Sequence, residues 1–275
     1  MLTETAYAKV NLALHVRARR PDGYHELESL FAFCADGDIL MAAPRDDGAL
    51  MLAITGPFAA ELGSGKDNLV LRAAAALREV AGVGTGAALT LDKRLPIASG
   101  IGGGSADAAA ALRLLVRLWG IRPPDIDLFA IAERLGADVP ACLGSQTVFG
   151  TGVGERLHAV DLDTGGRPIL LVNPLRPCPT GPVFRGWDGV DRGPLDPAAW
   201  AEGRNDLQSP AVALVPAIAG VLDALEGLPH ASLIRMSGSG ATCFALFETD
   251  AARDDAATAL RAVHPDWWIW PSELR

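Results

Sequence analysis

Residues 96–111, which read Pro-Ile-Ala-Ser-Gly-Ile-Gly-Gly-Gly-Ser-Ala-Asp-Ala-Ala-Ala-Ala, decide the fold of this chain. Their glycines run directly into an alanine-rich stretch that is typical of a closely packed helix. Glycine lets backbone N–H groups converge on an anion, and a helix N-terminus adds its dipole and its unpaired donors. The stretch therefore predicts a phosphate-binding loop followed by a helix over Ser105–Trp119, with Ser105 as N-cap. A flexible turn that only starts a helix is the alternative.

The two standard phosphate loops fit this chain poorly. A Walker A loop needs GxxxxGK followed by Ser or Thr, but the pair Gly65-Lys66 is followed by Asp67, and Ala60 stands where the first glycine belongs. A dinucleotide fingerprint read from Gly100 has Ser105 in place of its third glycine, and no clear βαβ unit surrounds it. A dinucleotide-dependent oxidoreductase is therefore disfavoured.

Upstream of the loop, the N-terminal segment alternates between apolar and polar residues. The even positions from Ala8 to Val16 are apolar, while Lys9 and Asn11 lie on the opposite face. A period of two over residues 6–16 predicts a strand with one face on the core.

The remaining pattern mixes helices and strands. Helices are predicted over residues 67–81 (capped by Asp67 or Asn68), 127–135 (closed by Gly136), near 211–225 and over 251–263. Strands are predicted over residues 87–92, 168–173, 232–236, 242–247 and 267–270, and residues 174–198 are expected to form a loop with little regular structure. This mixture predicts an α+β fold, with a domain boundary between about residues 150 and 175.

Composition narrows the class of protein. The chain has 275 residues, of which 49% are hydrophobic, enough for a large buried core, and no apolar run is long enough to span a membrane. The N-terminus lacks a secretory signal, so we expect a cytoplasmic protein. A net charge of −9 argues against nucleic-acid binding. The four cysteines are scattered and are expected to be buried and reduced: Cys34, Cys142, Cys178 and Cys243.

Three segments resemble the GHMP kinase superfamily. PIASGIGGGSADAAAAL is similar to its ATP-binding signature, AYAKVNLALHV to its N-terminal strand, and MSGSGATCFA, residues 236–245, to its C-terminal glycine motif. The resemblance covers nearly the whole chain and implies a two-domain fold, here residues 1–160 and 161–275, with ATP and substrate in a cleft between the domains. The matching ATP-binding residues are Pro96, Ile97, Ala98, Ser99, Gly100, Ile101, Gly102, Gly103, Gly104, Ser105, Ala106, Asn68 and Lys93.

Other segments resemble one branch of the superfamily, the kinases that phosphorylate 4-diphosphocytidyl-2-C-methylerythritol. These are RRPDGYHELESLF, DNLVLRAA, RLGADVPACL and VNPLRPCPTGPVF. The resemblance implies transfer of the γ-phosphoryl group of ATP to the 2-hydroxyl of that compound, in the methylerythritol phosphate pathway. Homoserine and mevalonate kinases are the nearest alternatives, and a non-catalytic nucleotide-binding protein on the same fold is a further one.

The resemblance also implies the catalytic residues. From its position before Val139-Pro140, Asp138 is expected to be the N-cap of a short helix. Its match to the catalytic aspartate of the family makes it the base for the acceptor hydroxyl. Lys9 would keep this carboxylate ionised and offset charge on the transferring phosphoryl group. A solvated strand face is the alternative for Lys9.

The substrate residues implied by the resemblance lie in two loops. Tyr24 and Phe184 would sandwich the cytosine, His25 would hydrogen-bond its polar edge, and Thr180 and Asn11 would make polar contacts. Surface packing is the alternative for the Tyr24-His25 pair, whereas Asn68 and Lys93 have alternatives as a helix cap and a surface lysine. Gly238, Ser239 and Gly240 are expected to shape the cleft, although a tight turn between two strands would need the same residues.

ATP is the expected co-substrate and Mg²⁺ the expected cofactor, held largely through phosphates because the sequence shows no dedicated acidic cage. The expected partners are ATP and a cytidylyl small molecule, with no nucleic acid and no membrane, and the chain is expected to be a monomer or weak homodimer. The pattern leaves open whether Arg17, Arg19 and Arg20 contact phosphates or only solvent.

Overall fold

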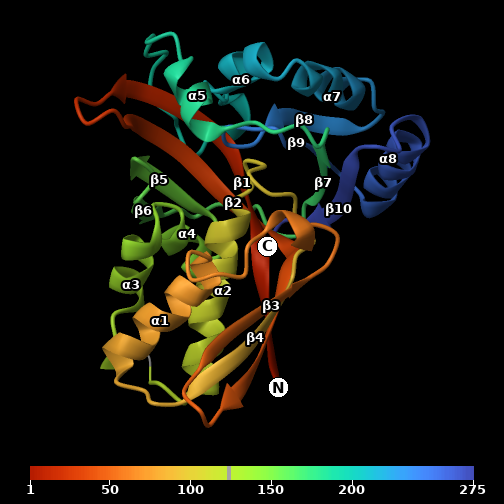
Figure 1. Cartoon of the computed structure of the whole chain (residues 1–275). Helices are drawn as coiled ribbons and strands as arrows, with labels where there is room; N and C mark the ends of the chain where they lie inside the picture. Colours follow the sequence, from red (N-terminus) through yellow and green to blue (C-terminus); the bar gives the residue numbers. More distant parts are fainter. Residues whose placement is uncertain (123–124) are drawn as a thin grey trace. The chain divides into compact units, whose positions relative to one another are not determined.

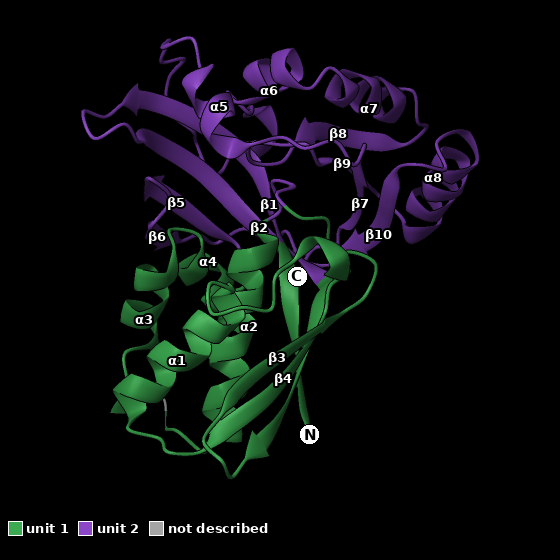
Figure 2. Ribbon diagram, viewed as in Figure 1, with its two compact units in different colours: residues 1–8, 36–97, 102–145 green, residues 9–35, 98–101, 146–275 purple. Residues whose placement is uncertain are grey.

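The structure, a computed structural model, describes residues 1–122 and 125–275 and confirms the α+β class. The chain forms two units that are interleaved in sequence (Figure 2). Unit 1 comprises Met1–Ala8, Asp36–Ile97 and Gly102–Ser145, and unit 2 comprises Lys9–Ala35, Ala98–Ile101 and Gln146–Arg275. The expected division near residue 160 stays a prediction. None of the helices in the described ranges is long and apolar enough to cross a membrane.

Figure 1 shows two long strands, β1 (Leu2–Arg19) and β2 (His25–Arg45). Each strand contributes residues to both units. The other elements of unit 1 are β3 (Leu50–Thr55), η1 (Ala59–Glu61), α1 (Leu69–Ala81), β4 (Gly86–Asp92), α2 (Gly103–Leu118), α3 (Leu128–Leu135) and α4 (Val139–Gly144). In this unit β4 pairs antiparallel with β2 and parallel with β3.

Helix α1 begins and ends where the sequence predicts. The side chain of Asn68 accepts a hydrogen bond from the Val70 amide, which confirms Asn68 as the N-cap. At the other end, Gly82 adopts φ 63°, a left-handed conformation that glycine reaches without strain.

Helix α2 begins two residues before the predicted Ser105. Its N-cap is Gly102 at φ 65°, and no side chain caps this end, so the prediction of Ser105 as the cap is wrong. Gly102 needs the left-handed backbone that a Cβ would strain, which explains a glycine rather than a serine at the first position. The buried alanines at positions 106 and 108–111 let α2 pack closely against α1.

Unit 2 contains the remaining elements. They are β5 (Val148–Gly152), β6 (Arg156–Ala159), β7 (Pro168–Asn173), α5 (Thr180–Arg185), η3 (Trp200–Glu202), α6 (Gln208–Leu214), α7 (Ala217–Glu226), β8 (Ala231–Met236), β9 (Cys243–Phe247), α8 (Asp250–Val263) and β10 (Trp268–Glu273). β5 pairs with β2 and β6, while the other four strands form an antiparallel sheet in the order β10-β7-β9-β8. Its core joins residues of this sheet, such as Val172 and Phe247, to residues of α7 and α8, such as Leu225 and Leu260.

Two further local predictions for this chain are wrong, and a third holds only in part. The single helix expected near 211–225 is divided into α6 and α7 at Val215-Pro216, because proline has no N–H and disfavours a helical residue before it. The loop expected over 174–198 contains α5. Strand β1 has buried residues on both faces, including the polar side chains of Lys9 and Asn11, and not on one face only.

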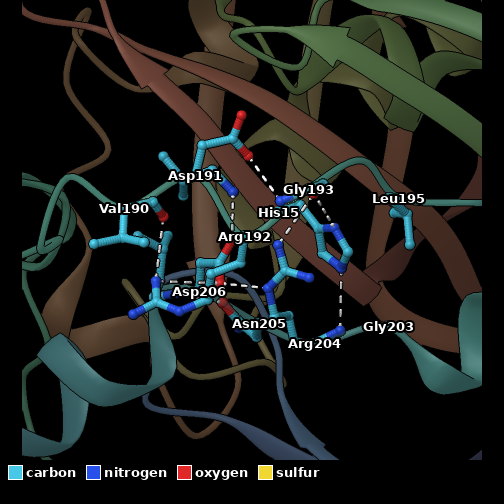
Figure 3. Close-up of polar contacts among 12 residues, drawn as sticks. His15, Val190, Asp191, Arg192, Gly193, Leu195, Gly203, Arg204, Asn205 and Asp206 are labelled. Atoms are coloured by element: carbon cyan, nitrogen blue, oxygen red, sulfur yellow. Dashed lines mark hydrogen bonds and ion pairs between the residues drawn. The ribbon is translucent and has the colours of Figure 1, made fainter.

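A polar cluster fastens the segment after α5 to β1 (Figure 3). His15 Nδ1–H donates to the Gly193 carbonyl (3.2 Å), and the Arg204 amide donates to His15 Nε2 (3.3 Å). Asp206 accepts from the Val16 amide (2.8 Å) and from Arg204 Nε (2.7 Å). Three of these four bonds link residues 178 to 190 positions apart, so they fix the course of a segment that has little regular structure of its own.

Candidate active site

The first half of the glycine loop, Ala98–Ile101, belongs to unit 2 and is held from two sides. On one side, the Lys9 amide of β1 donates to the Ile101 carbonyl (3.0 Å). On the other, Ser237 Oγ donates to the Gly100 carbonyl (2.9 Å), and a Cβ on Gly100 would come within 2.4 Å of the Ser237 carbonyl oxygen. The C-terminal glycine motif therefore supports this half of the loop, which excludes a side chain at Gly100.

Lys9 and Asn11 lie side by side on β1 within unit 2. Lys9 is only 3% exposed, so its interpretation as part of a solvated strand face is wrong. Its Nζ donates to Asn11 Oδ1 (3.1 Å) and lies 4.4 Å from the centre of the Phe31 ring. Asn11 Nδ2 in turn donates to Ser29 Oγ (2.8 Å), so the ammonium and the amide are both held in fixed positions.

Tyr24, His25, Phe184 and Thr180 also lie in unit 2. His25 is buried, and its ring centre lies 5.2 Å from that of Phe184 and 5.7 Å from that of Trp187. Tyr24 is 64% exposed, so much of this residue is accessible to a ligand. The Thr180 and Ser239 hydroxyls are hydrogen-bonded at 3.0 Å. The structure thus brings His25 and Phe184 together and adds Trp187, which the sequence gave no reason to select.

A hydrogen bond from Arg19 indicates which ring nitrogen of His25 carries the proton. Arg19 Nε–H donates to His25 Nε2 (3.4 Å), so Nε2 is an acceptor and the proton of the neutral ring lies on Nδ1. Burial, and secondarily the charge of Arg19, lower the pKa of His25. A buried neutral imidazole with one donor is suited to hydrogen-bonding an uncharged ring.

The arginines before this loop have partners of their own. Arg17 pairs with Glu28 (3.1 Å) and Asp191 (3.0 Å), and Arg20 pairs with Asp22 (3.1 Å). In these positions their charges are already compensated by carboxylates, which argues against a role as bare phosphate ligands.

The second half of the glycine loop belongs to unit 1 and borders a cavity of about 370 Å³. Gly104 and Asn68 are among the residues that line it. Both polar atoms of the Asn68 side chain are engaged, because Oδ1 caps α1 and Nδ2 donates to the Gly63 carbonyl (2.9 Å). Gly104 lies in the first turn of α2, and no side chain caps this end of the helix. Because the first amides of a helix have no partners within the helix, this end is suited to binding phosphate.

Lys93 is buried beneath the same loop, so its interpretation as a surface lysine is wrong. It is 2% exposed, and its ammonium donates to Asp38 Oδ2 (2.5 Å) and to Asp107 Oδ2 (2.7 Å). A Cβ on Gly103 would lie 3.1 Å from the Lys93 Nζ. Lys93 therefore supports the loop from within the protein, in an ion cluster that no sequence motif indicated.

Asp138 occupies the N-cap position of α4, as predicted, but its side chain makes no capping hydrogen bond. The helix behind it is firmly held, because Val139–Leu143 are buried and Arg113 donates to the Cys142 carbonyl (2.7 Å). Its carboxylate is therefore not consumed by the cap, and it stands at the start of a rigid helix.

Comparison with known proteins agrees with this arrangement. The profile of the GHMP kinases N terminal domain matches residues 68–146, and that of the GHMP kinases C terminal domain matches residues 192–266. The 4-diphosphocytidyl-2-C-methyl-D-erythritol kinase of Rhizorhabdus wittichii is 55% identical, over 99% of this chain and 94% of the relative. The protein of the same name from Sphingopyxis alaskensis is 53% identical, over 100% of this chain and 99% of the relative.

Solved structures of GHMP kinases also superpose on this chain. A crystal structure of 4-(cytidine 5'-diphospho)-2C-methyl-D-erythritol kinase superposes with a TM-score of 0.85 at 38% identity, covering 99% of both chains. Homoserine kinase from Cytophaga hutchinsonii superposes with a TM-score of 0.66 at 18% identity, covering 98% of this chain and 95% of the other, which shows a shared fold only. The chain therefore belongs to the GHMP kinases and, within them, to the family of 4-diphosphocytidyl-2-C-methyl-D-erythritol kinases.

Proposed function

We propose that this protein transfers the γ-phosphoryl group of ATP to the 2-hydroxyl of 4-diphosphocytidyl-2-C-methyl-D-erythritol, in the methylerythritol phosphate pathway of isoprenoid precursor biosynthesis. The main support for the proposal is the aromatic cluster of His25, Phe184 and Trp187 in unit 2, with the exposed Tyr24 next to His25 in sequence. A homoserine or mevalonate kinase has no base to stack and needs no such cluster.

We propose that the cytosine of the acceptor binds at this cluster. Tyr24 and Phe184 stack on the two faces of the ring, and His25 Nδ1–H donates to an acceptor on its edge. Thr180 and Asn11 contribute further polar contacts. The hydrogen bond between the Thr180 and Ser239 hydroxyls supports this assignment, because it holds Thr180 in one orientation.

We propose that ATP binds at the glycine loop and the α2 N-terminus, with Pro96–Ala106, Asn68 and Lys93 as its binding residues. The open end of α2 and the left-handed glycines at positions 100 and 102 support the phosphate assignment. Mg²⁺ would enter with ATP, bound mainly by phosphate oxygens and water, and would neutralise charge on the transferring group.

In the chemical step, Asp138 orients and deprotonates the acceptor hydroxyl, and Lys9 offsets negative charge on the transferring phosphoryl group. The burial of Lys9 and the rigid placement of Asp138 support these roles, because catalysis of phosphoryl transfer rests mainly on positioning and charge neutralisation. We further propose that the protein acts in the cytoplasm as a monomer or weak homodimer.

The acceptor assignment predicts a selective defect in Phe184→Ala. Loss of one aromatic stack costs about 1–3 kcal/mol, so the KM for the cytidylyl acceptor should rise roughly ten- to hundredfold while the KM for ATP barely moves. Steady-state kinetics with each substrate varied in turn measures both values. Because Phe184 also packs against the core of unit 2, Phe184→Leu tests whether an apolar side chain is enough. Phe129→Ala, at an exposed phenylalanine of α3, is the control. Equal effects on both KM values would make Phe184 a packing residue.

The lowered pKa of His25 predicts how acceptor binding depends on pH. The pKa of the folded ring lies below the ordinary histidine value, because protonation would place a charge in a buried site beside the Arg19 guanidinium. The KM for the acceptor should therefore change little between about pH 8 and 7 and rise at lower pH, as the ring becomes protonated. Measuring this KM between pH 5 and 8 tests the expectation, with His25→Gln expected to give a higher but flat profile. A wild-type KM that already changes above pH 7 would contradict it.

A further inference from the structure

The cavity of unit 1 has a buried acid in its wall that the reaction does not use. The cavity measures about 370 Å³ and is lined by residues that include Leu62, Asp67, Asn68, Leu69, Gly104 and Asp107. Asp107 lies in the second turn of α2 and is only 3% exposed. No role for it followed from the sequence.

One oxygen of this acid lacks a hydrogen-bond partner. Asp107 Oδ2 accepts from Lys93 Nζ (2.7 Å), whereas Oδ1 is buried and accepts from no donor among the described residues. A buried carboxylate oxygen without a partner costs the full desolvation penalty of that atom. Because Asp107 also lines the cavity, this unsatisfied acceptor points to a ligand that brings a donor.

The rest of the ion cluster holds Asp107 in place. Lys93 bridges Asp107 to Asp38, and Asp38 Oδ1 also accepts from the amides of Arg94 (2.6 Å) and Leu95 (2.8 Å). Both carboxylate oxygens of Asp38 thus accept hydrogen bonds, whereas in this cluster Asp107 has one oxygen that accepts none. Rotating Asp107 would only exchange its two oxygens, because the Lys93 ammonium always requires one of them.

The hydrogen-bonding groups of ATP indicate which part of the nucleotide can contact Asp107. A triphosphate presents only acceptors and negative charge to a carboxylate, whereas the nucleoside carries donors in the adenine amino group and the ribose hydroxyls. We propose that Asp107 is a specificity residue of the nucleotide site and accepts a hydrogen bond from the nucleoside of ATP. The inference rests on the proposed function, since it assumes that this cavity receives the nucleoside.

The electrostatics of the cluster fit this role. Burial, partly opposed by Lys93 and reinforced by Asp38, raises the pKa of Asp107 to about 7. Near neutral pH this carboxyl therefore gains from any donor that stabilises its ionised form. Asn68 cannot substitute for it as readily, because both polar atoms of its side chain already have partners.

The variant Asp107→Asn reverses the polarity that the cavity presents. Lys93 has only donors, so it selects the amide oxygen and turns the new NH₂ group toward the unpartnered position. An acceptor is thereby replaced by a donor without change of volume. Asp67→Asn is the matched control, because it removes an exposed carboxylate from the wall of the same cavity and should affect all nucleotides alike.

The experiment is calorimetric titration of the wild type, Asp107→Asn and Asp67→Asn, without acceptor, using ATP, inosine triphosphate, and 2'-deoxy- and 3'-deoxy-ATP. Wild type should bind ATP roughly ten- to hundredfold more tightly than one of these analogues, and Asp107→Asn should lose that preference. If Asp107→Asn no longer prefers ATP to inosine triphosphate, the donor is the adenine amino group. If it no longer prefers ATP to a deoxy analogue, the donor is a ribose hydroxyl. Both results support the proposal.

Equal affinity of wild type for all four nucleotides, or an unchanged preference in Asp107→Asn, would overturn the inference. If Asp107→Asn does not fold, Asp107→Ser replaces it, and the wild-type comparison still decides the first outcome. Failure of the proposed function would look different, because the wild type would then bind no ATP or would transfer phosphate to another acceptor.

Discussion

Replacing Asp138 with asparagine should lower the turnover number by about 10²–10⁴, while the Kd for ATP changes by no more than a few-fold. The substitution keeps the size of the side chain but removes the carboxylate that would deprotonate or orient the acceptor hydroxyl. Folding should be little affected, because asparagine is as well suited as aspartate to the N-cap position of α4. Single-turnover phosphoryl transfer measures the chemical step, and calorimetry measures ATP binding.

Asp161→Asn is the control for this experiment, because Asp161 is an exposed carboxylate outside the proposed site. It should have wild-type turnover. Near-normal turnover in Asp138→Asn, purified free of the wild-type protein, would remove Asp138 from the mechanism. A large loss of ATP affinity would instead place it among the nucleotide-binding residues.

The second large effect is expected in Lys93→Met, on stability. Removing the ammonium leaves Asp38 and Asp107 buried without a counter-charge, and breaking a buried ion pair in this way costs about 3–5 kcal/mol of unfolding free energy. Chemical denaturation followed by circular dichroism measures the loss. Lys66→Met, at an exposed lysine, is the matched control and should change stability by less than about 0.5 kcal/mol.

The loss of stability in Lys93→Met should also depend on pH. Without Lys93 the already raised pKa of Asp107 rises further, so between its unfolded and folded pKa values the folded protein binds more protons than the unfolded chain. Stability of Lys93→Met should therefore fall as pH increases from about 5 to 8, and adding Asp107→Asn should restore part of it. A Lys93→Met protein as stable as the wild type across this range would contradict the ion cluster.

Local patterns predicted most elements of this fold. Strand β1 and the cap of α1 depend on residues that are neighbours in sequence, so both could be inferred from the sequence, although β1 is buried on both faces. The break at Pro216 was also visible in the sequence, and the prediction of one helix across it underweighted the missing N–H of proline.

The parts of the site that escaped prediction depend on contacts between distant residues. Lys93 meets an acid 55 positions away and another 14 positions away, and nothing in the spacing of Asp38 or Asp107 indicates this. The contact of Ser237 with Gly100 joins residues 137 positions apart. Motif resemblance selected Lys93 and the glycines as site residues, but only the fold shows that Lys93 is part of a buried ion cluster.

The most direct test of the central claim is phosphoryl transfer from ATP by the purified wild-type protein, with 4-diphosphocytidyl-2-C-methyl-D-erythritol, homoserine and mevalonate offered separately. The account predicts rapid transfer to the cytidylyl compound alone, with ³¹P and ¹³C NMR of the product placing the new phosphate on the 2-oxygen. Asp138→Asn assayed in parallel controls for a contaminating kinase. Preferential turnover of homoserine or mevalonate, or a phosphate at another oxygen of the cytidylyl compound, would contradict the account.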